Sequence, residues 1–145
     1  MDELTTDAAS PNGSTLYLEI QQFYARQMHF LDDGHVEDWA RTFTDDGVFE
    51  VDGNAVRGAT DIVLAARRTT DQFAADGITR RHWIGMLNVT RDTDECSARS
   101  YALVLEIPRG GEAVIRRSTV CTDTLVREGD AWRVRYRRVS RDGLE

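Results

Sequence analysis

Residues 14–34 carry the pattern of an amphipathic helix. One set of side chains recurs every three or four positions, which is the spacing of a single helix face. This stripe consists of Leu16, Ile20, Phe23, Gln27 and Leu31, with Tyr17, Tyr24 and Met28 alongside. Ser14 or Thr15 is suited to cap the helix, and Gly34 is suited to end it.

Two shorter helices and a small hairpin are expected next. Helical spacing predicts a short second helix that contains Val36, Trp39, Ala40 and Phe43. Residues 48–52 and 55–57 are expected to be strands joined by a turn at Gly53-Asn54. A third helix is then expected from Thr60 to about Ala75, before Gly77.

The rest of the chain has the pattern of long strands joined by tight turns. We expect strands over residues 78–91, 97–107, 112–127 and 131–140, hence an antiparallel meander. Three helices packed on a strongly curved, mainly antiparallel sheet form an α+β architecture with a pocket between the two layers. The polar residues 1–13 are expected to be a disordered leader, and residues 14–145 a single domain.

The first long strand contains one ionisable ring. Strand alternation would place His82, Ile84, Met86 and Asn88 on one face, and Trp83, Leu87 and Val89 on the other. Burying an unpaired imidazole is costly, so His82 needs a partner, and Asp32 at the end of the first helix is a candidate. A carboxylate that orients an imidazole would provide a general base inside a small apolar cavity.

Composition and charge exclude several classes of function. The 145 residues carry a net charge of −7, which argues against nucleic acid as a partner. All 18 basic residues are arginine, which excludes a lysine Schiff base, a pyridoxal-phosphate attachment and a phosphate-loop lysine. With three histidines and no cofactor motif, we expect neither a metal nor a cofactor. Cys96 and Cys121 are expected to be reduced thiols.

The sequence shows no feature of a membrane or exported protein. No apolar run approaches the length of a membrane span, and the N-terminus lacks a basic segment followed by an apolar one. We therefore expect a cytoplasmic protein that does not contact membranes.

Several short segments along the chain form a recognisable set. They are Phe23-Tyr24-Ala25-Arg26-Gln27, Leu31-Asp32-Asp33-Gly34, Trp39 with Phe43, Asp46-Gly47-Val48-Phe49, His82-Trp83-Ile84-Gly85 and Trp132. In these segments the chain resembles the SnoaL-like group of the nuclear-transport-factor-like superfamily. The resemblance implies that residues 14–145 form a cone-shaped α+β barrel. It limits the chemistry less closely, because this fold hosts many reactions.

The resemblance also assigns roles to His82 and Asp32. In scytalone dehydratase, hexachlorocyclohexane dehydrochlorinase and bile-acid dehydratase, a histidine on the third strand removes a proton. An aspartate at the end of the first helix orients it. By position these residues resemble His82 and Asp32. The basic aspartate of ketosteroid isomerase would fall at Val51 and its acidic aspartate at Thr122, and the acidic aspartate of the bile-acid enzyme would fall near Val104, so all three aspartates are missing here.

Further residues are expected to line the pocket and contact the substrate. They are Gln27 and Tyr24 as hydrogen-bonding groups, Trp39, Phe43, Phe49, Val51 and Met86 as apolar walls, Val104 beside the small Ser100 and Ala102, and Thr122 with Tyr136 or Arg138 at the floor. For the apolar residues, packing in the core is the alternative role.

The face of the sheet opposite the pocket is expected to form a homodimer. Its apolar side chains are Trp83, Leu87, Val89, Tyr101, Leu103 and Leu105. On the last strand, Arg133, Arg135 and Arg137 alternate, and we expect them to be solvated or paired with acidic residues.

The expected function is that of a cofactor-independent cyclase or dehydratase, of lyase or isomerase type. It would act on an aromatic or polyketide-like hydrophobic small molecule in secondary metabolism, with His82 as general base oriented by Asp32. The alternatives are an epoxide-opening cyclase or isomerase, a protein that only binds a ligand, and a non-catalytic assembly subunit. The last would resemble the small subunit of ring-hydroxylating dioxygenases. In the structural alternative, His82 and Asp32 only satisfy each other in the core.

Overall fold

The computed structural model describes residues 5–7 and 11–144, and these form one mixed sheet with helices on one side. The helices are α1 (Pro11–Asp32), α2 (Val36–Ala40) and α3 (Ala59–Ala75). The strands are β1 (Thr5–Asp7), β2 (Phe43–Val51), β3 (Asn54–Arg57), β4 (Ile78–Asp92), β5 (Glu95–Pro108), β6 (Val114–Glu128) and β7 (Ala131–Arg141). Within the described residues the sheet order is β1-β4-β5-β6-β7-β2-β3.

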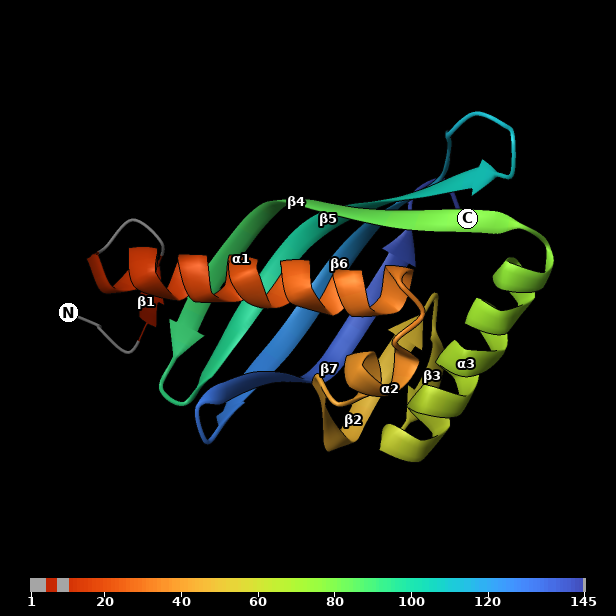
Figure 1. Ribbon diagram of the computed structural model, residues 1–145. Helices are drawn as coiled ribbons and strands as arrows, with labels where there is room; N and C mark the ends of the chain where they lie inside the picture. The colour runs from red at the N-terminus through yellow and green to blue at the C-terminus, as the bar shows by residue number, and fades with distance from the viewer. Residues whose placement is uncertain (1–4, 8–10, 145) are drawn as a thin grey trace.

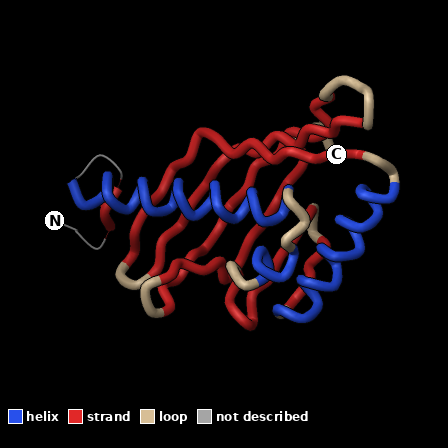
Figure 2. The backbone as a smooth tube through the Cα atoms, viewed as in Figure 1, coloured by secondary structure: helices blue, strands red, loops and turns tan. Residues whose placement is uncertain are grey.

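The sheet curves around α1, which lies across the four long strands (Figure 1). Strands β4 to β7 form the antiparallel meander expected from the sequence, and β2 pairs with β7 in parallel. Helices α2 and α3 cover the end of the sheet that α1 leaves open (Figure 2). The predicted α+β class, with helices on a curved and mainly antiparallel sheet, is confirmed.

The core lies between the apolar stripe of α1 and the inner face of the sheet. Leu16, Ile20 and Phe23 from the predicted stripe are buried. They pack in one cluster with residues of the long strands that include Val89, Ala98, Leu125 and Val134. This packing fixes α1 on the sheet, and it thereby positions the residues at the end of that helix.

A bulge in β4 changes which face its side chains occupy. The pairing of β4 with β5 shifts register between Gly85 and Asn88, and Met86 has a φ of 54°. An extra residue in a strand exchanges the inward and outward positions beyond it. The prediction for this segment is therefore wrong. Met86 is 76% exposed, whereas Val89 is buried and Leu87 packs against the core.

A second irregularity has the same effect on β7. Register between β6 and β7 shifts between Thr124 and Leu125, which pair with Tyr136 and Val134. Arg137 consequently points inward and is 5% exposed, contrary to the expected solvated position. Arg133 and Arg135 pair with Glu128 and Glu95, as the sequence suggested for that face.

The N-terminal segment differs from the expected disordered leader. Residues 5–7 form β1, which pairs with residues 90–92 of β4, and α1 begins at Pro11. Edge pairing needs only backbone groups, so a polar segment without a hydrophobic pattern can supply it. Proline at a helix start is favoured because its missing N–H would have no partner there. Residues 1–4 and 8–10 of the expected leader lie outside the described residues.

Phe43 belongs to β2 instead of the second helix. No helix among the described residues is long and apolar enough to cross a membrane.

Candidate active site

His82 and Asp32 lie in direct contact. Nδ1 of His82 is 2.6 Å from Oδ1 of Asp32, and the backbone N–H of His82 donates to Oδ2 at 3.1 Å. Both side chains are largely buried, with 15% of His82 and 7% of Asp32 exposed. The two hydrogen bonds use both carboxylate oxygens and hold the imidazole in one orientation. The pair that the sequence singled out is therefore brought together, while its catalytic role stays a prediction.

The end of α1 explains why Asp32 reaches the sheet. Gly34 has a φ of 85°, and the N–H of His35 donates to the carbonyl of Phe30 at 2.8 Å. A glycine in this left-handed conformation ends a helix abruptly. Asp32 is the last residue of α1, and there it contacts His82 of β4.

The contact with Asp32 determines which nitrogen of His82 faces the cavity. An ionised carboxylate only accepts hydrogen bonds, so the neutral ring carries its proton on Nδ1. Nε2 is then an unprotonated acceptor, and no described residue hydrogen-bonds to it. His82 lines the main cavity and Asp32 does not, so Asp32 supports the ring from behind.

The main cavity has a volume of about 610 Å³ and a largely apolar wall. Trp39, Phe49 and Val51 line it, as do Val104 and the small Ser100 and Ala102 beside it. Cavities of a few hundred Å³ with apolar walls and few polar groups are typical of small-molecule sites. The cavity is therefore large enough for a ligand with several rings.

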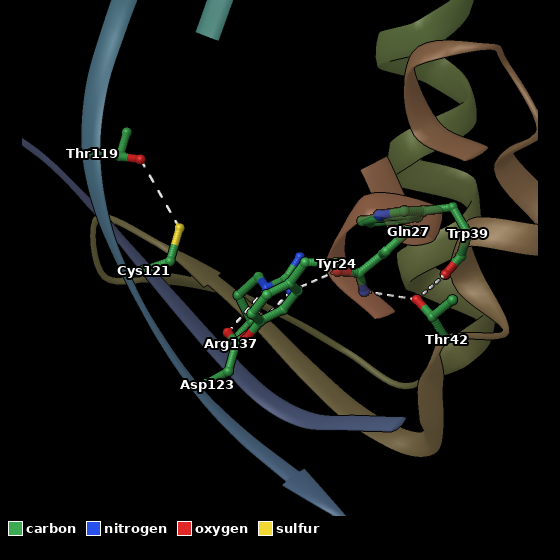
Figure 3. Close-up of polar contacts among 8 residues, drawn as sticks. All are labelled: Tyr24, Gln27, Trp39, Thr42, Thr119, Cys121, Asp123 and Arg137. Atoms are coloured by element: carbon green, nitrogen blue, oxygen red, sulfur yellow. Dashed lines mark hydrogen bonds and ion pairs between the residues drawn. The ribbon is translucent and has the colours of Figure 1, made fainter. Parts of the chain in front are cut away.

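One part of the cavity lining, here called the floor, carries a buried polar cluster whose residues are shown in Figure 3. The hydroxyl of Tyr24 donates to Asp123 at 2.6 Å, and Nη2 of Arg137 donates to the same carboxylate at 2.8 Å. Nη2 also donates to Oε1 of Gln27 at 2.7 Å, and Gln27 donates to Thr42 at 2.7 Å. Tyr24, Asp123 and Arg137 line the cavity, so its floor is polar and charged.

Burial shapes the ionisation of this cluster. Desolvation, reinforced by the negative charge of Asp123, raises the pKa of Tyr24 well above its ordinary value. Desolvation disfavours the charge of Arg137, but the contact with Asp123 outweighs it and raises the pKa of the guanidinium. Tyr24 therefore stays protonated and Arg137 stays charged at neutral pH.

Helix α1 supports both polar regions of the cavity. Tyr24 belongs to the floor cluster, and Asp32 contacts His82. Along the helix, Tyr24 and Asp32 are eight residues apart, which corresponds to about 12 Å. One rigid helix therefore sets the distance between the pair of His82 with Asp32 and the floor of the cavity.

The structure places some predicted site residues in the cavity and others elsewhere. Tyr24, Trp39, Phe49, Val51, Val104 and His82 line it. Gln27 is fully buried and reaches the cavity only through Arg137. Phe43 packs behind the cavity wall, with ring centroids 5.0 Å from Trp39 and 5.9 Å from Phe49.

The remaining predicted positions face away from the cavity. Met86 and Thr122 are exposed, Arg138 pairs with Glu50, and the hydroxyl of Tyr136 donates to Glu50. The bulges account for Met86, Tyr136 and Arg138. Thr122 faces outward because its neighbours Cys121 and Asp123 occupy the inward positions of β6, so the predicted strand phase is wrong here.

Sequence reasoning missed Asp123 and Arg137. Asp123 had a usable signal, because it alternates with Cys121 and Leu125 in positions typical of a buried face. The sequence held no such signal for Arg137, since the bulge that turns it inward depends on pairing with β6.

Cys96 and Cys121 are free thiols, and burial raises the pKa of Cys96 to about 12.

Comparison with known proteins agrees with this architecture. Residues 14–138 match the SnoaL-like domain. No curated protein matches the chain. The β subunit of a putative aromatic-ring-hydroxylating dioxygenase from Novosphingobium aromaticivorans shares the fold, at 21% identity and a TM-score of 0.73 over 91% of this chain and 92% of that one.

Three solved structures are more similar in sequence. Aln2 from a Streptomyces species is 35% identical, with 92% of this chain and 93% of that chain covered and a TM-score of 0.83. A protein of Catenulispora acidiphila in complex with S-DNPA is 35% identical, with 89% and 95% covered and a TM-score of 0.80. ActVI-ORFA from Streptomyces coelicolor is 31% identical, with 91% and 98% covered and a TM-score of 0.81. The chain belongs to the SnoaL-like family.

Proposed function

We propose that this protein is a cofactor-independent acid–base enzyme, a cyclase or dehydratase, that acts on an aromatic or polyketide-like small molecule. The observation that carries the proposal is the 2.6 Å contact between Nδ1 of His82 and Asp32 at the wall of an apolar cavity. Membership in the SnoaL-like family supports the same class of reaction. A core without catalytic function has no need for an imidazole whose second nitrogen faces a cavity.

The proposed reaction begins with proton transfer to His82. Nε2 takes a proton from a carbon next to a carbonyl, and the electron pair of that C–H bond forms an enolate. Asp32 stabilises the imidazolium that results and keeps its orientation. In a dehydration, the enolate then expels a hydroxyl group, which takes the proton back from Nε2 and leaves as water.

The cavity floor supports this chemistry from the other side. Arg137 is charged and lines the cavity, and no described residue accepts a hydrogen bond from its Nη1. Nη1 can therefore donate a hydrogen bond to an oxygen of the substrate at the floor, beside the ion pair of Arg137 with Asp123. The general acids whose positions fall at Thr122 and near Val104 are absent, so His82 returns the proton itself.

Replacement of His82 tests the proposal. We expect His82→Gln to abolish turnover while the circular dichroism spectrum stays unchanged, since glutamine cannot act as a base. Turnover would be followed by mass spectrometry with S-DNPA, the ligand in the structure of the Catenulispora acidiphila protein, and with a panel of hydroxylated naphthalene and anthracene ketones. Arg68→Gln, at an exposed position on α3, is the control. Full activity of His82→Gln would contradict the proposal.

The same assay separates the two enzymatic alternatives. Dehydration lowers the product mass by one water, whereas opening of an epoxide by a hydroxyl of the same molecule leaves the mass unchanged. The assembly subunit is a different case, because it predicts a stable complex with a larger chain and no effect of His82→Gln on that complex. Native mass spectrometry of the protein from its own cells tests for such a complex.

A further inference from the structure

The charges that line the main cavity do not balance within the described residues. Each carboxylate on its wall already has an arginine partner. The pairs are Asp52 with Arg141 at 2.6 Å, Asp123 with Arg137 at 2.8 Å and Glu106 with Arg116 at 3.3 Å.

Two further arginines line the same cavity without such a partner. Neither Arg80 nor Arg117 forms an ion pair or a side-chain hydrogen bond with any residue that the structure describes. The guanidinium of Arg80 is half-buried and lies 4.3 Å from the ring centroid of Phe73. Glu106 lies opposite Arg80 on the neighbouring strand, yet its carboxylate pairs with Arg116.

The surroundings of Arg80 disfavour its charge. Desolvation lowers its pKa, and the nearby charge of Arg117 lowers it further, although Asp32 and Glu106 act in the opposite direction. Two guanidinium groups close enough to repel each other would be stabilised by an anion between them. Asp32, Glu106 and Asp52 lie near these two groups, but each has another partner, and no described carboxylate forms an ion pair with Arg80 or Arg117.

Sheet register places both arginines beside the proposed base. Arg80 and His82 are two residues apart on the inner face of β4, about 7 Å along the strand. His82 pairs with Val104, and Val104 pairs with Arg117, so Arg117 lies in the same row two strands away, about 10 Å across. An anion held by both groups would sit next to the reacting part of a ligand in the cavity.

We propose that Arg80 and Arg117 bind a carboxylate of the substrate, so that the substrate is an aromatic or polyketide-like acid instead of a neutral molecule. This inference rests on the proposed function for the role of the ligand as a substrate. The guanidinium groups present N–H donors that match the two oxygens of a carboxylate. The anchored carboxylate fixes how far the rest of the molecule reaches along the cavity past His82.

A pair of ligands that differ only in charge tests the proposal. 1-Naphthylacetic acid and 1-naphthylacetamide have the same ring and almost the same size. Their dissociation constants would be measured by isothermal titration calorimetry at neutral pH. We expect the acid to bind about 10- to 100-fold more tightly, which corresponds to one charge-assisted interaction.

Substitution of each arginine tests whether Arg80 and Arg117 cause the preference for the acid over the amide. Arg80→Gln and Arg117→Gln should each lower the preference for the acid by about tenfold, while Arg80→Lys retains most of it. Arg68→Gln removes the same charge from an exposed arginine outside the cavity and should change nothing. His82→Gln should also keep the preference, which separates an effect of the arginines from an effect of the imidazole.

Binding and turnover distinguish this proposal from the proposed function. Equal binding of acid and amide, no binding of the acid, or a preference that survives in both Arg80→Gln and Arg117→Gln would overturn the carboxylate site. Full turnover by His82→Gln with an intact acid preference would instead overturn the base and leave the carboxylate site standing.

Discussion

At the scale of single residues, the bond between Asp32 and His82 controls which proton the imidazole carries. Asp32→Asn would keep the size of the side chain but allow its amide to donate to Nδ1. The ring would then hold its proton on Nε2, where it cannot act as a base. We expect turnover to fall by about 10²- to 10⁴-fold in steady-state kinetics.

The neighbouring aspartate provides a matched control for this variant. Asp33 is exposed and has the same charge and nearly the same place in the sequence. Asp33→Asn should retain wild-type turnover. An Asp32→Asn enzyme with wild-type turnover, and with its unchanged fold shown by circular dichroism, would mean that Asp32 does not set the tautomer.

At the scale of elements, the cluster at the cavity floor ties α1 to β6 and β7. Asp123 is 2% exposed and accepts hydrogen bonds from Tyr24 on α1 and Arg137 on β7. Removal of one member of a buried ion pair leaves the other charge without a partner. We expect Asp123→Ala to lower the free energy of unfolding by about 3–5 kcal/mol in urea denaturation.

An exposed ion pair on the same sheet provides the control for Asp123→Ala. Glu128 pairs with Arg133 at 3.0 Å, and the Glu128 side chain is 51% exposed. Glu128→Ala should leave the free energy of unfolding almost unchanged, since solvent screens such pairs. Similar losses in both variants would show that the floor cluster does not join α1 to the sheet.

At the scale of the whole molecule, the outer face of the sheet exposes large apolar side chains. Trp83 is 67% exposed, Ile115 is 61% exposed and Tyr101 is 47% exposed. They lie on adjacent strands β4 to β6, and an apolar face of this kind is typical of a subunit interface. We expect a homodimer that forms through this face.

Substitution of a charge on that face tests the dimer. Trp83→Glu combined with Ile115→Glu should give a monomer by analytical ultracentrifugation, because a dimer would bury both charges. Leu64→Glu changes an equally exposed leucine on α3, 55% exposed, and should leave the dimer intact. A monomeric wild-type protein at micromolar concentration would contradict the prediction.

Local patterns in the sequence were sufficient for the architecture. The stripe from Leu16 to Leu31, the short hairpin and the four long strands each follow from side-chain periodicity, which depends on neighbours a few residues away. The contact of His82 with Asp32 could also be predicted from the sequence, because both residues lie near the ends of elements whose packing the fold class restricts.

Tertiary structure decided which residues complete the site. Met86 faces outward and Arg137 faces inward because one extra residue in β4 and one in β7 reverse the alternation beyond them. Such a bulge arises from pairing with the adjacent strand, so the strand's own periodicity does not show it. Among the residues that the structure describes, Arg80 and Arg117 likewise lack a carboxylate partner only because the folded sheet pairs each nearby acid with another group.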